Sequence, residues 1–260
     1  MLSYQHSYHA GNLADVHKHM ALSIVLEALT VKDKPLSYME THSGRGLYNF
    51  QSEESLKTGE ASFGFQALHK AHKIPRDSAY YQAIEKIQKT LGKDFYPGSP
   101  MIARLLLRDY DTLNLMELHP EEYRVLHKTM WSFANVHVHK RDGYEGVLAI
   151  SPPSARRGLV LIDPSYEVKT EYEKAAKFIS KLHRKWAEAV IMIWYPILSA
   201  GLHKDLKQII TKEVFPKVYI SEITFPKPPK AEGMKGSGLI LINTPYGIGE
   251  QLATLPKMFV

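Results

Sequence analysis

The spacing of apolar and polar residues predicts an α/β chain in which strands alternate with helices. The first eleven residues have no apolar period, and we expect them to form a loop. From Leu13 to Leu29 apolar residues recur at helical spacing, with Asn12 and Asp15 in position to cap this helix. Runs typical of strands occur at 36–40, 112–118, 134–139, 159–163, 189–195, 218–225 and 239–243. Helical segments, including an amphipathic one at 172–186, lie in most of the intervals. This alternation favours a Rossmann-like, doubly wound and largely parallel sheet, whose ligands bind beyond the carboxyl ends of the strands.

Between residues 52 and 98 the pattern changes to two polar, helix-compatible segments with no strand between them. We therefore predict a small inserted helical subdomain at 52–98 and a main domain formed by 1–51 and 99–260. The insertion carries 7 Lys and Arg against 6 Asp and Glu, so it is a weak candidate for contact with phosphates. We expect it either to recognise the shape of a nucleic acid or to buttress the fold.

The chain is basic, and its excess charge is concentrated in one stretch. The formal net charge is 33 − 27 = +6, and residues 169–235 alone hold 13 Lys and Arg against 7 Asp and Glu, or 13 − 7 = +6. A face that binds a polyanion needs such asymmetry, because each neutralised phosphate releases a condensed counterion. A lysine-rich solvated surface would have the same composition. The Pro- and Lys-rich segment 225–237 predicts an exposed, mobile loop in which Lys227, Lys230 and Lys235 grip phosphates, or else a plain connector.

The composition also excludes several classes of protein and of site. The longest apolar run, 189–198, is too short to span a bilayer, and the N-terminus lacks the pattern of a secretory signal, so we expect a cytoplasmic protein without a membrane partner. The absence of cysteine excludes disulfides and thiolate metal sites. His17 and His19 would point roughly 200° apart on a helix, and His137 and His139 lack a third ligand, so we expect no metal.

Polar residues and glycines follow the predicted strands at the edge where a ligand would bind. The first strand ends in residues 40–46, Glu-Thr-His-Ser-Gly-Arg-Gly, whose small residues permit a tight turn close to a ligand. Glu117 follows the second strand, and Asp142 and Gly143 follow the third. A nucleoside cofactor needs such a turn, an acid for its ribose hydroxyls and a polar group for its adenine. The turn lacks the full three-glycine fingerprint, however, and Glu117 would also serve as a helix cap before Pro120.

The most informative residues follow the fourth strand, where the chain reads Asp163-Pro164-Ser165-Tyr166. The amino nitrogen of adenine is a poor nucleophile because its lone pair is delocalised into the ring. The Asp163 carboxylate and the Pro164 carbonyl would each accept a hydrogen bond from this nitrogen and turn its lone pair toward a methyl donor. Tyr166 would stack on the base, a contact worth roughly 1–3 kcal/mol. Taken alone, the tetrapeptide equally suits a β-turn opened by Asp-Pro, but its position after a strand, in a chain whose first strand ends in a glycine turn, favours catalysis.

These motifs resemble those of known enzymes. Asp-Pro-Ser-Tyr is similar to the Asp/Asn-Pro-Pro-Tyr/Phe signature of amino-nitrogen methyltransferases, although Ser165 replaces the second proline and puts the rigidity of the turn in doubt. Essentially the whole chain resembles the bacterial 23S ribosomal RNA adenine-N6 methyltransferase family. The matching segments are the N-terminal string 1–12, then 14–16, 18–19, 41–46, the helical insertion, 97–100, 117–120, 141–143 and 163–167.

The resemblance implies a class I methyltransferase sheet, S-adenosyl-L-methionine as cofactor and one adenine of 23S ribosomal RNA as the methyl acceptor. The residues it implies for the cofactor site are His19, His42, Ser99, Glu117, Asp142, Gly143 and Asp163. It implies Asp163 as the catalytic acceptor, supported by Pro164 and Tyr166. It implies that the substrate lies against Tyr4, His6 and Lys18.

Two other functions remain open at the level of sequence. The same tetrapeptide would serve a DNA adenine-N6 methyltransferase. A nucleic-acid-binding protein could also retain the cofactor fold without turnover, although such a protein would not need Glu117 and Asp142 together. We expect a monomer that acts on protein-free ribosomal RNA or on an early assembly intermediate.

Overall fold

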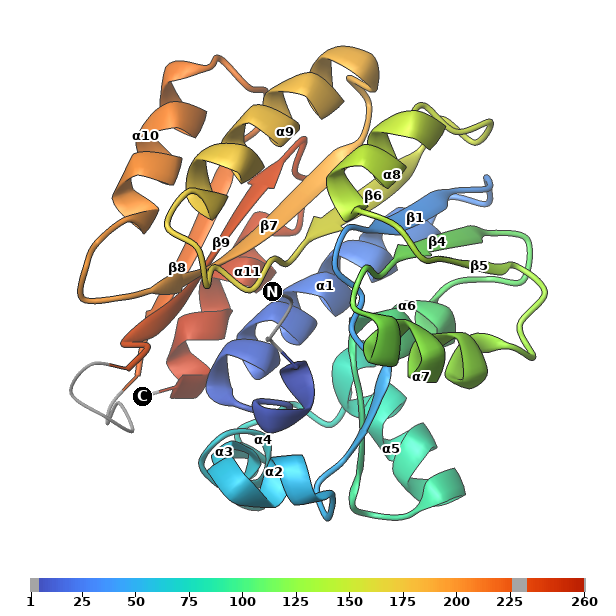
Figure 1. Cartoon of the computed structure of the whole chain (residues 1–260), viewed down its shortest axis with the longest axis vertical. Helices are drawn as coiled ribbons and strands as arrows, with labels where there is room; N and C mark the ends of the chain where they lie inside the picture. The colour runs from blue at the N-terminus through green and yellow to red at the C-terminus, as the bar shows by residue number, and fades with distance from the viewer. Residues whose placement is uncertain (1–4, 226–232, 260) are drawn as a thin grey trace.

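The centre of the computed structural model, which describes residues 5–225 and 233–259, is a seven-stranded sheet (Figure 1). Its strands are β1 (Ser37–Glu40), β4 (Thr112–Met116), β5 (Val136–His139), β6 (Gly158–Ile162), β7 (Val190–Ile197), β8 (Tyr219–Thr224) and β9 (Gly236–Ile242). They are arranged in the order β5-β4-β1-β6-β7-β9-β8. All neighbours pair in parallel except β9, which is antiparallel to both β7 and β8. The predicted mainly parallel α/β sheet is confirmed.

The direction of chain progression reverses between β1 and β6. From β1 the chain adds β4 and then β5 on one side, and it returns to lay β6 on the other side of β1, with Glu40 in register with Leu161. The crevice beyond the carboxyl ends of strands at such a reversal is the usual ligand site of a doubly wound sheet. The segments after β1 and β6 therefore meet where the sequence predicts a site.

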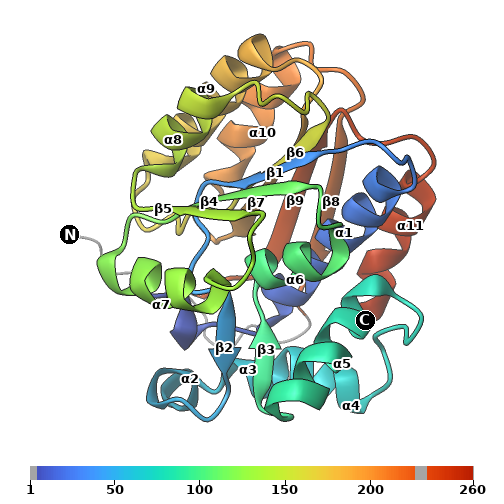
Figure 2. The ribbon, with the colours of Figure 1, turned by 90° about the vertical axis from the view of Figure 1, so that its right-hand side faces the viewer.

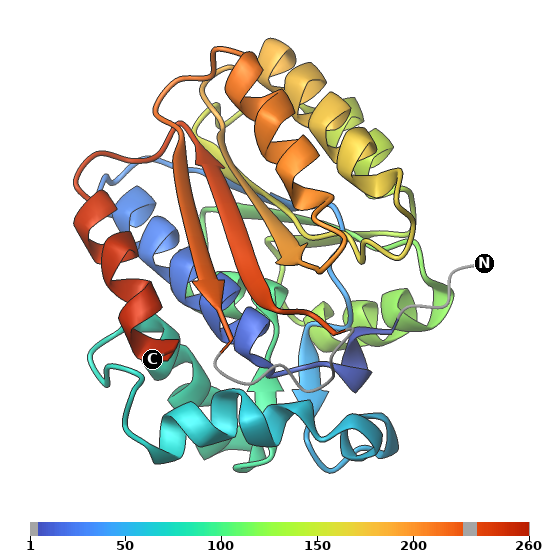
Figure 3. The same ribbon diagram turned by 90° about the vertical axis from the view of Figure 1, so that its left-hand side faces the viewer.

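Helices cover both faces of this sheet (Figures 2 and 3). One face is covered by α8 (Gly143–Ile150), α9 (Glu171–Lys185) and α10 (His203–Lys212). The other is covered by α1 (Leu13–Thr30), α6 (Ser99–Leu106), α7 (Pro120–Met130) and α11 (Gly249–Thr254), which the short helix η2 (Leu255–Phe259) follows. The apolar face predicted at 172–186 is buried in α9 and the residue after it. Within the described residues no helix is both long enough and apolar enough to cross a membrane.

The central helix of the site, α1, begins as its sequence predicts. The Asn12 side chain accepts a hydrogen bond from the backbone N–H of Asp15 at 2.9 Å. The helix lies between the sheet and the insertion, so most of its polar residues are buried, namely Asp15, His17, Lys18, His19 and Ser23. His17 shows how these residues are satisfied: its two ring nitrogens lie 2.9 Å from the hydroxyls of Ser221 in β8 and Ser237 in β9. Helix α1 is thereby held to the antiparallel part of the sheet.

The segment predicted as an insertion is largely helical and packs beneath α1 (Figure 1). It contains α2 (Glu53–Thr58), α3 (Glu60–Phe63), α4 (Phe65–Lys70) and α5 (Ala79–Leu91). Near its end β3 (Phe95–Pro97) pairs antiparallel with β2 (Leu47–Asn49), a strand too short to give a periodic signal in the sequence. Phe65, Tyr80 and Ile84 share one apolar core with Val16 of α1. The boundaries at 52 and 98 stay a prediction.

Two loop predictions need correction where the structure describes them. His6–Tyr8 form the short 3-10 helix η1 within the expected N-terminal loop. The loop predicted at 225–237 ends earlier, because Gly236 and Ser237 are buried residues of β9. The glycines of this strand allow close packing rather than a turn: a Cβ on Gly238 would lie 2.1 Å from the Tyr195 ring.

Candidate active site

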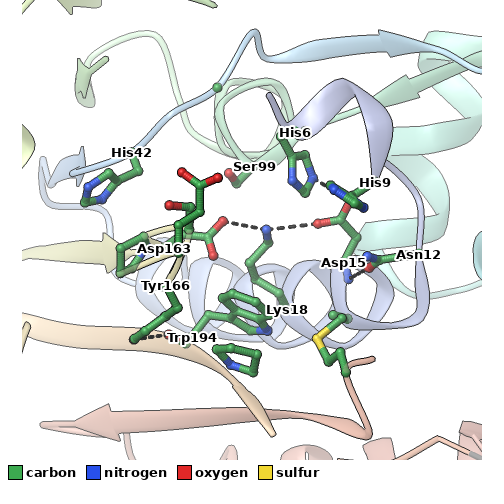
Figure 4. Close-up of a pocket in the computed structure, with 18 of the residues that line it drawn as sticks. His6, His9, Asn12, Asp15, Lys18, His42, Ser99, Asp163, Tyr166 and Trp194 are labelled. Atoms are coloured by element: carbon green, nitrogen blue, oxygen red, sulfur yellow. Dashed lines mark hydrogen bonds and ion pairs between the residues drawn. The ribbon is translucent and has the colours of Figure 1, made fainter. Parts of the chain in front are cut away.

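A cavity of about 1270 Å³ opens beyond the carboxyl ends of β1, β4 and β6 (Figure 4). Ligand pockets typically measure roughly 300–1,000 Å³, so this one has room for more than one small ligand. The predicted site residues that line it are His6, Lys18, His19, His42, Ser99, Glu117, Asp142, Gly143, Asp163, Pro164 and Tyr166. Lys235 is exposed and is not part of the wall. Tyr4, Lys227 and Lys230 lie outside the described residues.

Glu117 ties the end of β4 to the glycine turn that follows β1. Its Oε2 accepts a hydrogen bond from the backbone N–H of Gly44 and its Oε1 accepts one from that of His119, both at 2.8 Å. Gly44 and Gly46 have positive φ angles of +60° and +74°, which the tight turn requires. The first turn of α7 is capped by the His119 side chain and not by Glu117, so the capping alternative does not apply. Burial raises the pKa of Glu117.

Asp142 and Gly143 bring the start of α8 against the turn after β1. The Asp142 carboxylate accepts a hydrogen bond from the N–H of Glu145 at 2.9 Å and so caps the helix. A Cβ on Gly143 would lie 1.8 Å from the carbonyl oxygen of Thr41, so this approach requires glycine. His42 is held beside them by its Nδ1, 2.8 Å from the Thr41 hydroxyl, and burial lowers its pKa.

Asp163 is joined to the N-terminal part of the chain through Lys18 (Figure 4). The Lys18 ammonium lies 2.6 Å from Oδ2 of Asp163 and 2.9 Å from Oδ1 of Asp15. The other oxygen of Asp15 lies 2.8 Å from both His6 Nε2 and the backbone nitrogen of Gly11. Burial opposes the charge on Lys18, but the two carboxylates outweigh it and raise the pKa of the ammonium. Burial likewise opposes the charge on Asp15, yet His6 and Lys18 hold its pKa well below the usual range.

Tyr166 is set deep in the cavity wall. It has a φ of +55°, which is rare for a residue other than glycine, and the surrounding contacts hold it there. Its hydroxyl donates to the carbonyl of Trp194 at 2.8 Å, and its ring centroid lies 4.4 Å from that of Tyr172. The side chain is only 6% exposed. In this conformation Tyr166 braces the turn after β6, and its stacking on a base stays a prediction.

A buried carboxyl group lies at the end of β1. Glu40 accepts a hydrogen bond from the Tyr38 hydroxyl, and its Oε2 has no well-formed hydrogen bond with the described residues. Ser99, the first residue of α6, and Ser43 lie near enough to lower the pKa of Glu40. Burial outweighs these hydroxyls and raises the pKa of Glu40 to about 8. A neutral carboxyl group therefore lies near the charged groups that line the cavity.

His19 belongs to the same buried layer. Its Nδ1 lies 2.8 Å from the hydroxyl of Tyr96, which in turn lies 2.9 Å from the hydroxyl of Tyr80. Burial lowers the pKa of His19 to about 3, so the ring is neutral near neutral pH. The chain of contacts connects α1 with β3 and α5 of the insertion. No group of three or more His, Cys, Asp or Glu side chains suited to a metal occurs in the described parts of the chain.

Asp15 and Trp194 line the cavity beside Lys18, but neither was among the sequence-predicted site residues. Asp15 is the acidic link between His6 and Lys18, but its position at the start of α1 indicated only a cap. Trp194, the fifth residue of β7, lines the cavity, and its ring centroid lies 5.8 Å from the Lys18 ammonium. Trp194 is the last residue but one of the strand predicted at 189–195, so the tendency of ligands to bind at the carboxyl ends of strands is a sequence signal for it.

The chain is similar to known proteins in both sequence and structure. A family model described as "Ribosomal RNA large subunit methyltransferase D, RlmJ" matches residues 33–259. Ribosomal RNA large subunit methyltransferase J of Escherichia coli K12 is 38% identical over 253 residues, which are 97% of this chain and 90% of the relative. The protein of the same name from Haemophilus influenzae is 39% identical over 254 residues, with the same coverage. A crystal structure of a Legionella pneumophila protein has a TM-score of 0.86 at 36% identity and covers 96% of this chain and 94% of that chain.

Proposed function

The chain belongs to the ribosomal RNA large subunit methyltransferase D, RlmJ family, and we propose that it transfers a methyl group from S-adenosyl-L-methionine to the N6 amino group of an adenine in 23S ribosomal RNA. The observation that carries this proposal is the Asp163–Tyr166 turn, which lines the cavity at the reversal point of the sheet. Family membership supports the class of substrate, and the turn supports amino-nitrogen chemistry.

The cavity fits a nucleoside cofactor that carries a positive charge. Gly44 lines the cavity, and a Cβ at this position would lie 2.4 Å from the Tyr48 hydroxyl, so the turn disfavours any side chain here. Glu117 and Asp142 offer carboxylate oxygens for ribose hydroxyls and an adenine amino group. The acidic residues of the wall are Asp15, Glu60, Glu117, Glu122, Asp142, Asp163, Glu167 and Glu171, and the lysines are Lys18, Lys57 and Lys174. Such an acidic lining suits a sulfonium cation.

The chain contributes orientation and electrostatics to the reaction. When bound, S-adenosylmethionine supplies an electrophilic methyl group. The Lys18 ammonium engages Oδ2 of Asp163, and Oδ1 accepts no hydrogen bond from the described residues, so this oxygen is open to an amino N–H of adenine. The Pro164 carbonyl is a second acceptor for the same amino group. Methylation of this nitrogen would break the bond between the methyl carbon and the sulfonium sulfur, which would keep the electron pair. The nitrogen would then release one proton, which Oδ1 of Asp163 is suited to hold.

The charge of the wall also constrains how RNA approaches. A neutral adenine base can enter an acidic cavity. The phosphates of the RNA backbone, in contrast, are repelled by the carboxylates of the cavity wall. Lys57 and Lys174 are exposed and line the cavity, so they suit phosphates that remain outside. Lys174 belongs to the basic stretch 169–235, which thereby extends to the cavity. This arrangement favours a flipped base from a nucleic acid over a free phosphorylated nucleotide.

The proposal is tested by methyl transfer from radiolabelled S-adenosylmethionine to protein-free 23S ribosomal RNA from cells that lack the gene. We expect incorporation as N6-methyladenosine, mapped to one position by mass spectrometry. Asp163→Asn should reduce kcat by roughly 100-fold or more, because it removes a charged acceptor at the reacting nitrogen. The matched control is Asp205→Asn, at an exposed position of α10, which should retain wild-type activity.

Three outcomes would contradict the proposal. Wild-type kcat in Asp163→Asn would remove the assigned role of this residue. A duplex DNA that competes equally with the RNA would favour DNA adenine methylation. Calorimetric binding of S-adenosylmethionine without transfer to either nucleic acid would favour a non-catalytic binding protein.

A further inference from the structure

An exposed aromatic side chain lies on the wall of the cavity. Phe63, the last residue of α3, is 75% exposed to solvent and contributes to the wall together with Lys57 and Thr58. Two residues later, Phe65 is 2% exposed and packs in the core against Phe50 and Tyr96. The two phenylalanines therefore differ in role. Burial of the Phe65 ring holds the segment in place, whereas the exposed Phe63 ring contributes much less hydrophobic stabilisation to the fold.

The backbone beneath Phe63 is held rigidly against the N-terminal loop. The N–H of Phe65 donates to the carbonyl of Gly11 at 2.7 Å. A Cβ on Gly64 would lie 2.2 Å from that same carbonyl oxygen, so the two segments approach as closely as glycine permits. Glu60 at the start of α3 lies 2.8 Å from Nδ1 of His9 and accepts a hydrogen bond from the Asn12 amide at 3.0 Å. The Phe63 backbone is thus fixed against the N-terminal segment that follows η1.

A solvated aromatic ring beside a cavity that admits a base is suited to stacking on a neighbouring base. Single-stranded RNA is bound chiefly through such stacking and through contacts to its phosphates. Lys57, in α2, is exposed, and its ammonium lies 5.9 Å from the centroid of the Tyr8 ring. A cation is therefore also present on the side of the cavity where Phe63 lies. The nearest acid on α3, Glu60, is occupied by His9 and Asn12. Aromatic and basic groups therefore stand together outside the acidic interior.

We infer that Phe63 stacks on the nucleotide that flanks the methylated adenine, with Lys57 beside the phosphate of that nucleotide. This inference rests on the proposed function and assigns the insertion a direct contact with RNA. The insertion as a whole is nearly neutral, so stacking rather than charge is its main contribution.

The inference is tested by steady-state methyl transfer to protein-free 23S ribosomal RNA from cells that lack the gene. Phe63→Ala should raise the KM for RNA roughly 5- to 150-fold, the range that corresponds to loss of one base-stacking contact. Because the stacking contact would be the same in the bound complex and in the transition state of methyl transfer, kcat should change little. Phe63→Tyr should keep the wild-type KM. The matched control is Leu56→Ala, which removes another exposed apolar side chain of the insertion, 62% exposed and outside the cavity wall.

Each alternative has its own signature. If the wild-type protein transfers no methyl group, the proposed function itself fails. If the wild-type protein is active and Phe63→Ala has an unchanged KM for RNA, the inference fails while the proposed function stands. An equal rise of KM in Phe63→Ala and Leu56→Ala would also overturn it, and weaker calorimetric binding of S-adenosylmethionine in Phe63→Ala would assign the ring to the cofactor instead.

Discussion

Lys18 and Asp163 are separated by 145 residues, yet the ammonium nitrogen of Lys18 lies 2.6 Å from a carboxylate oxygen of Asp163. The same ammonium lies 2.9 Å from Asp15, so one buried cation is shared by two carboxylates. Burying an unpaired charge costs several kcal/mol, and this arrangement avoids that penalty for all three groups. It also leaves the Asp163 side chain little freedom to rotate, which a residue that orients a nucleophile requires.

Replacement of Lys18 by methionine should destabilise the protein. Asp15 and Asp163 would remain in the wall without their cation, and breaking a buried ion pair from one side costs about 3–5 kcal/mol. We expect a loss of this size in the free energy of unfolding measured with urea, together with loss of methyl transfer. The matched control is Lys89→Met, which breaks the exposed ion pair with Glu85 and should change stability by about 0.5 kcal/mol or less. Equal losses in the two variants would contradict this account.

The buried carboxyl group of Glu40 should make the protein less stable as pH rises toward 8. Burial raises its pKa in the folded state to about 8, against an ordinary value of 4.5. Between these values the folded protein holds one more proton than the unfolded chain, so the free energy of unfolding falls by about 1.4 kcal/mol per pH unit. Glu40→Gln keeps an acceptor for Tyr38 but cannot titrate, and should remove this slope between pH 5.5 and 7.5. Parallel stability profiles for the two proteins would show that Glu40 does not titrate in this range.

His17 should give a pH dependence of opposite sign. Burial lowers its pKa to about 3, against 6.5 in an unfolded chain. From pH 6.5 down to about 3 the unfolded chain holds the additional proton, so stability falls on acidification. His17→Gln can still bond to the hydroxyls of Ser221 and Ser237, and should reduce the acid slope of the free energy of unfolding by about one proton, or about 1.4 kcal/mol per pH unit. An unchanged slope in urea titrations between pH 4 and 6 would exclude His17 as the source.

A methyl group at position 143 should separate the start of α8 from the turn after β1. In Gly143→Ala the new Cβ would meet the Thr41 carbonyl oxygen at 1.8 Å, which forces backbone movement at the proposed cofactor site. We expect a loss of about 1–3 kcal/mol in stability and a rise of roughly tenfold or more in the Kd for S-adenosylmethionine by calorimetry. In the control Gly249→Ala nothing lies within 4 Å of the new Cβ, and both quantities should stay at wild-type values. A wild-type Kd for S-adenosylmethionine in Gly143→Ala would mean that cofactor binding does not depend on the close approach of Gly143 to the Thr41 carbonyl.

The local pattern of the chain was sufficient for most of the helices and strands. Apolar periodicity predicted α1 and all the strands of the large sheet, because in these segments one face or both must be buried. It missed β2 and β3, whose pairing is a tertiary contact between two three-residue segments. It also extended the loop before β9 too far, because Gly236 and Ser237 have loop composition but pack against neighbours distant in sequence.

The sequence by itself determined which residue types follow each strand, and the parallel topology then brings Glu117, Asp142 and Asp163 to one cavity. The state of each side chain was decided only by the tertiary structure. Asp15 was identified as a helix cap, but the fold makes it the partner of Lys18, and Tyr166 is buried against Tyr172 where the motif indicated an accessible ring. The physical reason is that burial, ion pairing and a raised or lowered pKa depend on neighbours far along the chain, which a motif does not contain.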